Sequence, residues 1–131
     1  MANLRYRSQF HQSYAALRAS LFATINFGAT GAPTIVSGTG MGIASITRSS
    51  AGTYVIALTQ PFNTLLGVRH TFVDPSAAPA SPSLYVSSNA VASRSAPALT
   101  VVFNAAGTAT DPASGESVLL EIVLNNSALS Y

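Results

Sequence analysis

Hydrophobic and polar residues alternate most regularly between Gly42 and Leu58. Large apolar side chains at Tyr54, Ile56 and Leu58 alternate with other residues, and this period of two is typical of a strand with one face on a core. A weaker alternation runs from residue 43 to 48, and the sequence Ser-Ser-Ala-Gly lies between the two runs. Gly52, the last of these four, can adopt the positive φ that closes a tight turn. The pattern predicts a β-hairpin.

The same period predicts further strands on both sides of this hairpin. Residues 34–36 and 84–91 give weak patterns, whereas four other segments give clear ones. In the last of these, Leu119 and Val123 make the second face apolar too, which is typical of a central strand or of one that faces a partner. The positions expected to face inward in the clear segments are Leu21, Ala23, Ile25 and Phe27; Leu66, Val68, His70 and Phe72; Leu99, Val101 and Phe103; and Val118, Leu120, Ile122 and Leu124.

Proline and small residues separate the predicted strands. Pro61 ends the hairpin, and a single helical turn is expected over residues 62–66. Residues 76–83 (SAAPASPS) and 104–115 (NAAGTATDPASG) are expected to be exposed loops. Strands of this length without a long helix predict an all-β fold, either an antiparallel β-sandwich or a jelly-roll-like barrel. Turn spacing does not distinguish the two.

The first 18 residues differ in pattern from the strands that follow. Tyr6, Phe10 and Tyr14 recur every four residues, which fits one side of a helix, although a flexible or partner-ordered terminus is an equally good interpretation. We therefore divide the chain into an N-terminal arm, residues 1–18, and a single β domain, residues 19–131. Polar residues interrupt the apolar part of the arm, so we expect no signal peptide, and no apolar run reaches the ~20 residues of a membrane span.

The composition narrows the possible functions. Charged residues make up 8% of the chain, against roughly 25% in ordinary soluble domains. There is no cysteine and no lysine, and the net charge of +2 comes from six arginines and four acidic residues. A disulfide framework and a cysteine-based metal site are therefore unavailable. We expect neither a nucleic-acid nor a membrane partner, because no dense basic cluster occurs, and we expect an exterior that is hydroxylated or covered by protein partners.

Candidate catalytic groups are sparse. His70 and Asp74 lie four residues apart on one predicted strand and could join a serine in a hydrolytic triad, but no serine lies in a G-x-S-x-G turn. We prefer a half-buried strand residue for His70 and a turn-former before proline for Asp74. His11 and His70 have no recognisable metal-ligand spacing with the carboxylates. Residues 38–42 (GTGMG) lack the strand-loop-helix context of a phosphate-binding loop. We expect no enzyme, no cofactor and no metal.

The arginines are the remaining candidates. For Arg48 and Arg69 we prefer solvated charge that keeps a weakly charged surface soluble. In the arm, solvated charge and contact with a partner are about equally supported, since the planar guanidinium pairs bidentately with carboxylates of another protein. The candidate partner-binding residues are Arg5, Arg7, Phe10, Tyr14 and Arg18.

An ordered set of short motifs resembles small virion proteins of tailed bacteriophages. It begins with GATGAP at residues 28–33, GIASITR at 42–48 and GTYVIAL at 52–58. It continues with PFNTLL at 61–66 and DPASG at 111–115, and a last apolar strand ends in Asn126-Ser127. The similarity covers residues 25–74 and 108–127, and the order of the pieces is more specific than any one piece.

That resemblance implies a structural role rather than chemistry. Members with a known role are similar to head decoration or cement proteins, which are β-rich and often trimeric. It implies a homotrimer on the outer capsid surface of the virion, with the major capsid protein as partner. The alternative is a tail-fibre or receptor-binding domain of a phage particle. Such a domain would place aromatic residues in exposed loops, and residues 75–83 and 104–115 contain none.

Overall fold

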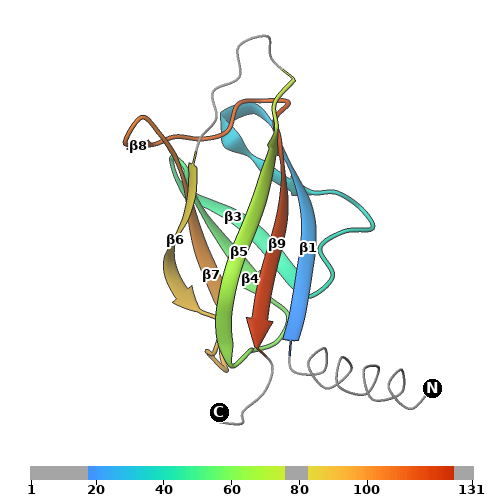
Figure 1. The fold of residues 1–131 in the computed structure, drawn as a ribbon. Helices are drawn as coiled ribbons and strands as arrows, with labels where there is room; N and C mark the ends of the chain where they lie inside the picture. The colour runs from blue at the N-terminus through green and yellow to red at the C-terminus, as the bar shows by residue number, and fades with distance from the viewer. Residues whose placement is uncertain (1–17, 76–82, 126–131) are drawn as a thin grey trace, which may run out of the picture.

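Two antiparallel β-sheets pack face to face in the computed structural model, which describes residues 18–75 and 83–125. The two layers are seen in Figure 1, where β1, β9 and β5 form the front sheet and β3, β4 and β7 lie behind it. The predicted all-β class is therefore confirmed, and of the two predicted architectures the structure has the β-sandwich.

The first sheet has the strand order β2-β1-β9-β5. Its strands are β2 (Pro33–Ile35), β1 (Arg18–Phe27), β9 (Ser117–Asn125) and β5 (Thr64–Val73). The last strand of the chain therefore lies between β1 and β5, which confirms the central position predicted from its two apolar faces. A short 3₁₀ turn, η1 (Ala29–Gly31), links β1 to β2.

The second sheet has the order β3-β4-β7-β6. It consists of β3 (Ile43–Ser50), β4 (Thr53–Leu58), β7 (Ala98–Ala105) and β6 (Ser83–Ala90). The predicted hairpin is β3–β4, and Gly52 closes it with a φ of 69°. A two-residue strand, β8 (Thr108–Ala109), pairs with the end of β7 on a sharp turn.

The core lies between the sheets and is richest in aromatic rings near one end. Phe27, Tyr54 and Phe103 contact one another edge to face, with ring centroids 5.4–5.6 Å apart, and Phe72 adds a fourth ring 5.4 Å from Phe103. Edge-to-face pairs contribute roughly 0.5–1.5 kcal/mol beyond their burial. The inward positions predicted for β1, β4, β7 and β9 are all buried. The prediction for β5 is wrong in part, because Leu66 and His70 are exposed and the register of β5 shifts between Leu65 and Gly67.

The predictions for two segments outside the β5 alternation are also wrong. Residues 62–66 are not helical, because the amides of Phe62 and Asn63 donate to the carbonyls of Val91 and Asn125 rather than within a turn, and β5 begins at Thr64. Residues 104–115 are not all loop, because β7 extends to residue 105 and β8 follows it. At residues 62–66 partners that are distant in sequence determine the backbone conformation, whereas β8 forms by local pairing with the end of β7.

Strand β1 includes the last residue of the predicted arm. Arg18, which the sequence placed in the arm, is the first residue of β1 and pairs with Asn125 of β9. Residues 1–17 and most of the predicted loop 76–83 lie outside the described residues. The strand β6 begins at Ser83.

Candidate functional site

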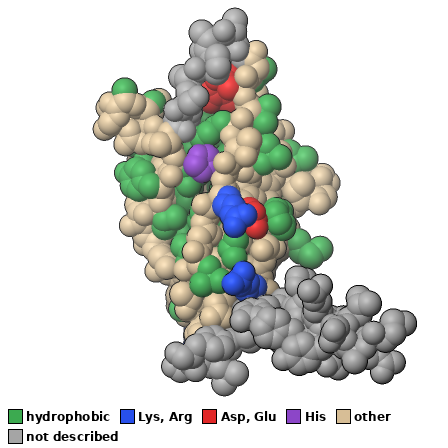
Figure 2. Space-filling view, viewed as in Figure 1, with side chains coloured by type: hydrophobic (Ala, Val, Ile, Leu, Met, Phe, Trp, Pro, Cys, Tyr) green, Lys and Arg blue, Asp and Glu red, His purple; other side chains and the backbone are tan. Residues whose placement is uncertain are grey.

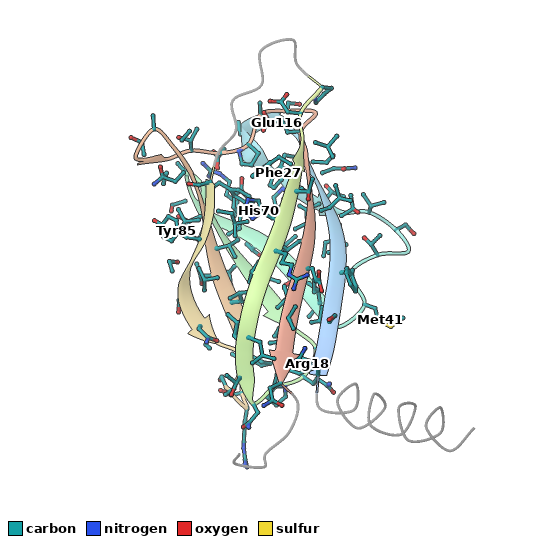
Figure 3. The ribbon with its side chains drawn as sticks, in the orientation of Figure 1. Arg18, Phe27, Met41, His70, Tyr85 and Glu116 are labelled. Atoms are coloured by element: carbon teal, nitrogen blue, oxygen red, sulfur yellow. The ribbon has the colours of Figure 1, made fainter. Side chains whose placement is uncertain are left out.

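The predicted partner-binding residues fall almost entirely outside the described part of the chain. Arg5, Arg7, Phe10 and Tyr14 belong to residues 1–17. Arg18 is described, and its side chain is exposed at the end of β1 (Figure 3). It is thus available to a partner.

The candidate catalytic pair is placed in two different environments. His70 is exposed rather than half-buried as we expected, and its ring packs edge to face on Phe72, 5.5 Å away. Asp74 instead interacts with Glu116, whose pKa is raised by burial and also by the nearby Asp74 carboxyl group. Within residues 18–75 and 83–125, no three histidine or acidic side chains gather where they could hold a metal ion.

Arg48 is not a freely solvated charge, contrary to our preferred interpretation. Its Nε and Nη2 atoms donate to the two carboxylate oxygens of Asp111 at 2.9 and 2.7 Å. Asp111 Oδ1 also accepts from the Gly52 amide at 2.8 Å and lies 3.0 Å from the Tyr54 hydroxyl. The same hydroxyl lies 2.8 Å from the carbonyl oxygen of Gly31. We call these five residues the Asp111 cluster.

The electrostatics of the Asp111 cluster indicate that it links separate segments of the fold. The bond from Arg48, together with those from Gly52 and Tyr54, lowers the pKa of Asp111 to about 2 against the opposing effect of burial. Burial and the Asp111 carboxylate raise the pKa of the Tyr54 hydroxyl well above its usual range, so it remains a neutral donor. The bonds of the carboxylate to Arg48, Gly52 and Tyr54 tie the 104–115 segment to β3, to β4 and to the turn between them. The bond from Tyr54 to Gly31 adds η1 to the same cluster.

Two positions of the Asp111 cluster require glycine because other atoms approach their backbone closely. Gly31 and Gly52 both have positive φ, 72° and 69°. A Cβ at Gly31 would lie 2.6 Å from both Asp111 Cγ and the Tyr54 hydroxyl oxygen, and one at Gly52 would lie 2.5 Å from the Thr110 nitrogen. Side chains at these positions would push the cluster apart.

A shallow groove lies on the outer face of the first sheet and runs along β9. Two rows of neighbouring side chains form it, Phe22–Glu121–Arg69 and Thr24–Leu119–Thr71, each with one residue from β1, β9 and β5 in that order. Thr39, from the loop between β2 and β3, adds to the β1 wall, and the groove holds about 320 Å³. Its floor passes from apolar Leu119 to acidic Glu121.

Three of the six large apolar side chains that are exposed in the described residues lie at this groove or beside it. Phe22 is 60% exposed and Leu119 45%, while Met41 is 90% exposed in an adjoining depression that shares Phe22 and Thr39. Figure 2 shows this face, with hydrophobic side chains beside a basic and an acidic one, and Figure 3 shows Met41 at the edge of the molecule. The charged pair is Arg69 and Glu121, whose nearest atoms are 3.9 Å apart. The groove therefore combines the apolar side chains of Phe22 and Leu119 with threonines and one loosely held ion pair.

Sequence reasoning missed both the Asp111 cluster and the groove. Arg48 and Asp111 are 63 residues apart, and no spacing pattern connects them. The apolar second face of β9 was a usable signal for the groove, because Leu119 forms its floor. Phe22 opposite it could be anticipated only once β1 and β9 were known to be neighbours.

Comparison of the chain with protein-family models, with curated proteins and with solved structures gives no match. None of the described segments is a helix of the length and hydropathy needed to cross a bilayer.

Proposed function

We propose that this chain is a structural virion protein, a decoration or cement protein that stabilises the head of a tailed bacteriophage. In this proposal it sits on the outer capsid surface as a homotrimer and binds the major capsid protein. Arginines of the N-terminal arm contribute to that contact, and the β-sandwich supplies a rigid body.

The observation that carries the proposal is where the motif pieces meet in space. Gly31 lies in GATGAP, Arg48 ends GIASITR, Gly52 and Tyr54 lie in GTYVIAL, and Asp111 begins DPASG. Hydrogen bonds and the Gly31 contact bring all five into the Asp111 cluster. Residues that act together explain why such pieces would recur together in one order. This supports a shared fold with the phage virion proteins and, through it, a shared role.

The surface properties are consistent with that role. A cement protein must bury part of its surface against a lattice, and repeated weak contacts then add through avidity. The chain carries little charge, and the outer face of β1, β9 and β5 exposes large apolar side chains. Contiguous exposed apolar surface of this kind marks sites of protein contact.

The test is binding to preassembled capsids that lack this protein, measured by cosedimentation. Replacing Arg5, Arg7 and Arg18 together by alanine should weaken binding at least about tenfold, since each charge-assisted bond contributes roughly 1.5–3 kcal/mol. Binding of the unaltered protein should also fall with added salt. Arg94→Ala is the matched control, because Arg94 is an exposed arginine in the connection after β6.

Imaging of the virion separates this proposal from its alternative. Density for the sandwich at threefold positions of the head is the expected result. Density only at the tail tip would favour the tail-fibre or receptor-binding role. A virion that lacks the protein would exclude both.

A further inference from the structure

The groove along β9 includes an apolar part of the first sheet that no described segment covers. The inner face of that sheet is covered by the second sheet, whereas Phe22 and Leu119 on the outer face remain 60% and 45% exposed. Burying apolar surface is favourable, so an occupant with large apolar side chains would gain stability here. The question is which chain supplies it.

We propose that the N-terminal segment of a neighbouring copy, residues 1–17, occupies this groove. The segment joins the body at Arg18, the first residue of β1, and Phe22 lies only four residues further along the same strand. At 3.3 Å per residue, Arg18 and Phe22 are about 13 Å apart along the strand. Seventeen residues span about 25 Å as a helix and more when extended, so the segment reaches well beyond its own attachment point.

The chemistry of the segment matches that of the groove. Tyr6, Phe10 and Tyr14 supply large side chains at four-residue intervals, a spacing that places them along one side of a helix. The segment contains no aspartate or glutamate, so nothing in it repels Glu121 on the groove floor. Arg69 does not neutralise Glu121 tightly, since it is 80% exposed and 3.9 Å away.

The connection between segment and strand favours exchange between copies. To lie on its own groove, the chain would have to reverse direction between Tyr14 and Arg18. Residues 15–17 are Ala-Ala-Leu, which includes none of the glycine, proline, asparagine or aspartate residues that favour tight turns. Exchange with the groove of a second molecule requires no such reversal. Exchange of one segment per copy in a head-to-tail sense closes into a ring when the rotation fits, as in a trimer.

This inference does not depend on binding to a capsid, and it is tested on the isolated full-length protein. Light scattering should give an oligomer, about 40 kDa for three chains of 13.4 kDa. Leu119→Asp, on the groove floor, should raise the dissociation constant of the oligomer at least about tenfold. Leu66→Asp is the matched control, since Leu66 is 51% exposed on β5 but does not line the groove. On the segment side, Tyr6, Phe10 and Tyr14 replaced together by serine should act like Leu119→Asp.

A crosslinking experiment identifies the occupant directly. A photoreactive benzoylphenylalanine in place of Phe10 is introduced into isotopically heavy protein, which is refolded together with light protein. Crosslinks from heavy to light chains that map to β1, β5 and β9 around Leu119 are the expected result. Crosslinks confined to one chain, crosslinks to another surface or no crosslinks would each overturn the proposal. So would a monomeric wild type, or equal loss of the oligomer in both aspartate variants.

Discussion

Asparagine in place of Asp111 removes the charge of the cluster while keeping the shape of the side chain. Its amide keeps one acceptor oxygen but turns an NH₂ group toward the donors of Arg48. The neighbours lower the pKa of Asp111 from its ordinary 3.8 to about 2, which at 1.36 kcal/mol per pH unit corresponds to about 2 kcal/mol. The side chains of Asp111 and Arg48 are 20% and 35% exposed, so water screens part of this attraction. We expect Asp111→Asn to lower the free energy of unfolding by about 1–2 kcal/mol near neutral pH.

The pH dependence of this loss has a definite sign. Because the pKa of Asp111 is lower in the folded than in the unfolded protein, the stabilisation is complete above the ordinary value of 3.8. It disappears as the pH falls through about 2. Urea denaturation followed by circular dichroism should therefore show a clear gap between wild type and variant near neutral pH, and a much smaller gap at about pH 2.

Glu121→Gln provides the matched control. It also removes a carboxylate facing an arginine, but the atoms are 3.9 Å apart and Arg69 is largely exposed, so we expect a change below about 0.5 kcal/mol. A cost for Asp111→Asn no larger than that of the control would refute the assignment of the cluster as a joint between segments. A gap that persists unchanged at about pH 2 would show that the carboxylate charge is not its origin.

Three further changes test the core, a carboxyl pair and a turn. Ile56→Ala or Ile122→Ala should lower the free energy of unfolding by roughly 2–5 kcal/mol, because both side chains are fully buried; costs under about 1 kcal/mol in denaturation would contradict the inward alternation. Glu116→Gln should raise the urea midpoint of unfolding near neutral pH but not near pH 4. The pKa of Glu116 is raised above its ordinary value of 4.5 in the folded protein, so ionisation of this carboxyl beside Asp74 weakens the fold as the pH rises. Ala106→Asn should raise the melting temperature and add up to about 1 kcal/mol to the free energy of unfolding. Ala106 has a φ of 51° in the β7–β8 turn, and asparagine tolerates that conformation better. An unchanged or lower melting temperature would contradict this.

The sequence predicted the strands in which large apolar residues recur at every second position. This holds along β4 and β9, where each predicted inward position is buried. The helical turn at 62–66 was predicted wrongly, because local composition does not register the hydrogen bonds from Phe62 to Val91 and from Asn63 to Asn125. Strand β8 was missed for a similar reason, since two residues carry no periodicity.

The candidate sites were less predictable than the fold. The groove needs the neighbour order β1-β9-β5, and the cluster needs Arg48 and Asp111 brought together across 63 residues. Alternation along one strand fixes which side chains share a face, but it says nothing about which strand lies next to it. The apolar second face of β9 indicated a contact surface, and the structure shows that β1 and β5 lie beside it.

Because β1 pairs with β9, from Arg18 opposite Asn125 onward, the first sheet cannot be completed until β9 is available. β9 follows every other described strand in the chain, yet it takes part in two of the three pairings of its sheet. During synthesis, β1 and β5 therefore wait without their partner until β9 has left the ribosome, while the β3–β4 hairpin closes locally. Closing so long a loop has a high entropic cost and makes folding slow. In that interval the edges of β1 and β5 are open to pairing with other chains, so rapid completion of β9 pairing protects the nascent protein from aggregation.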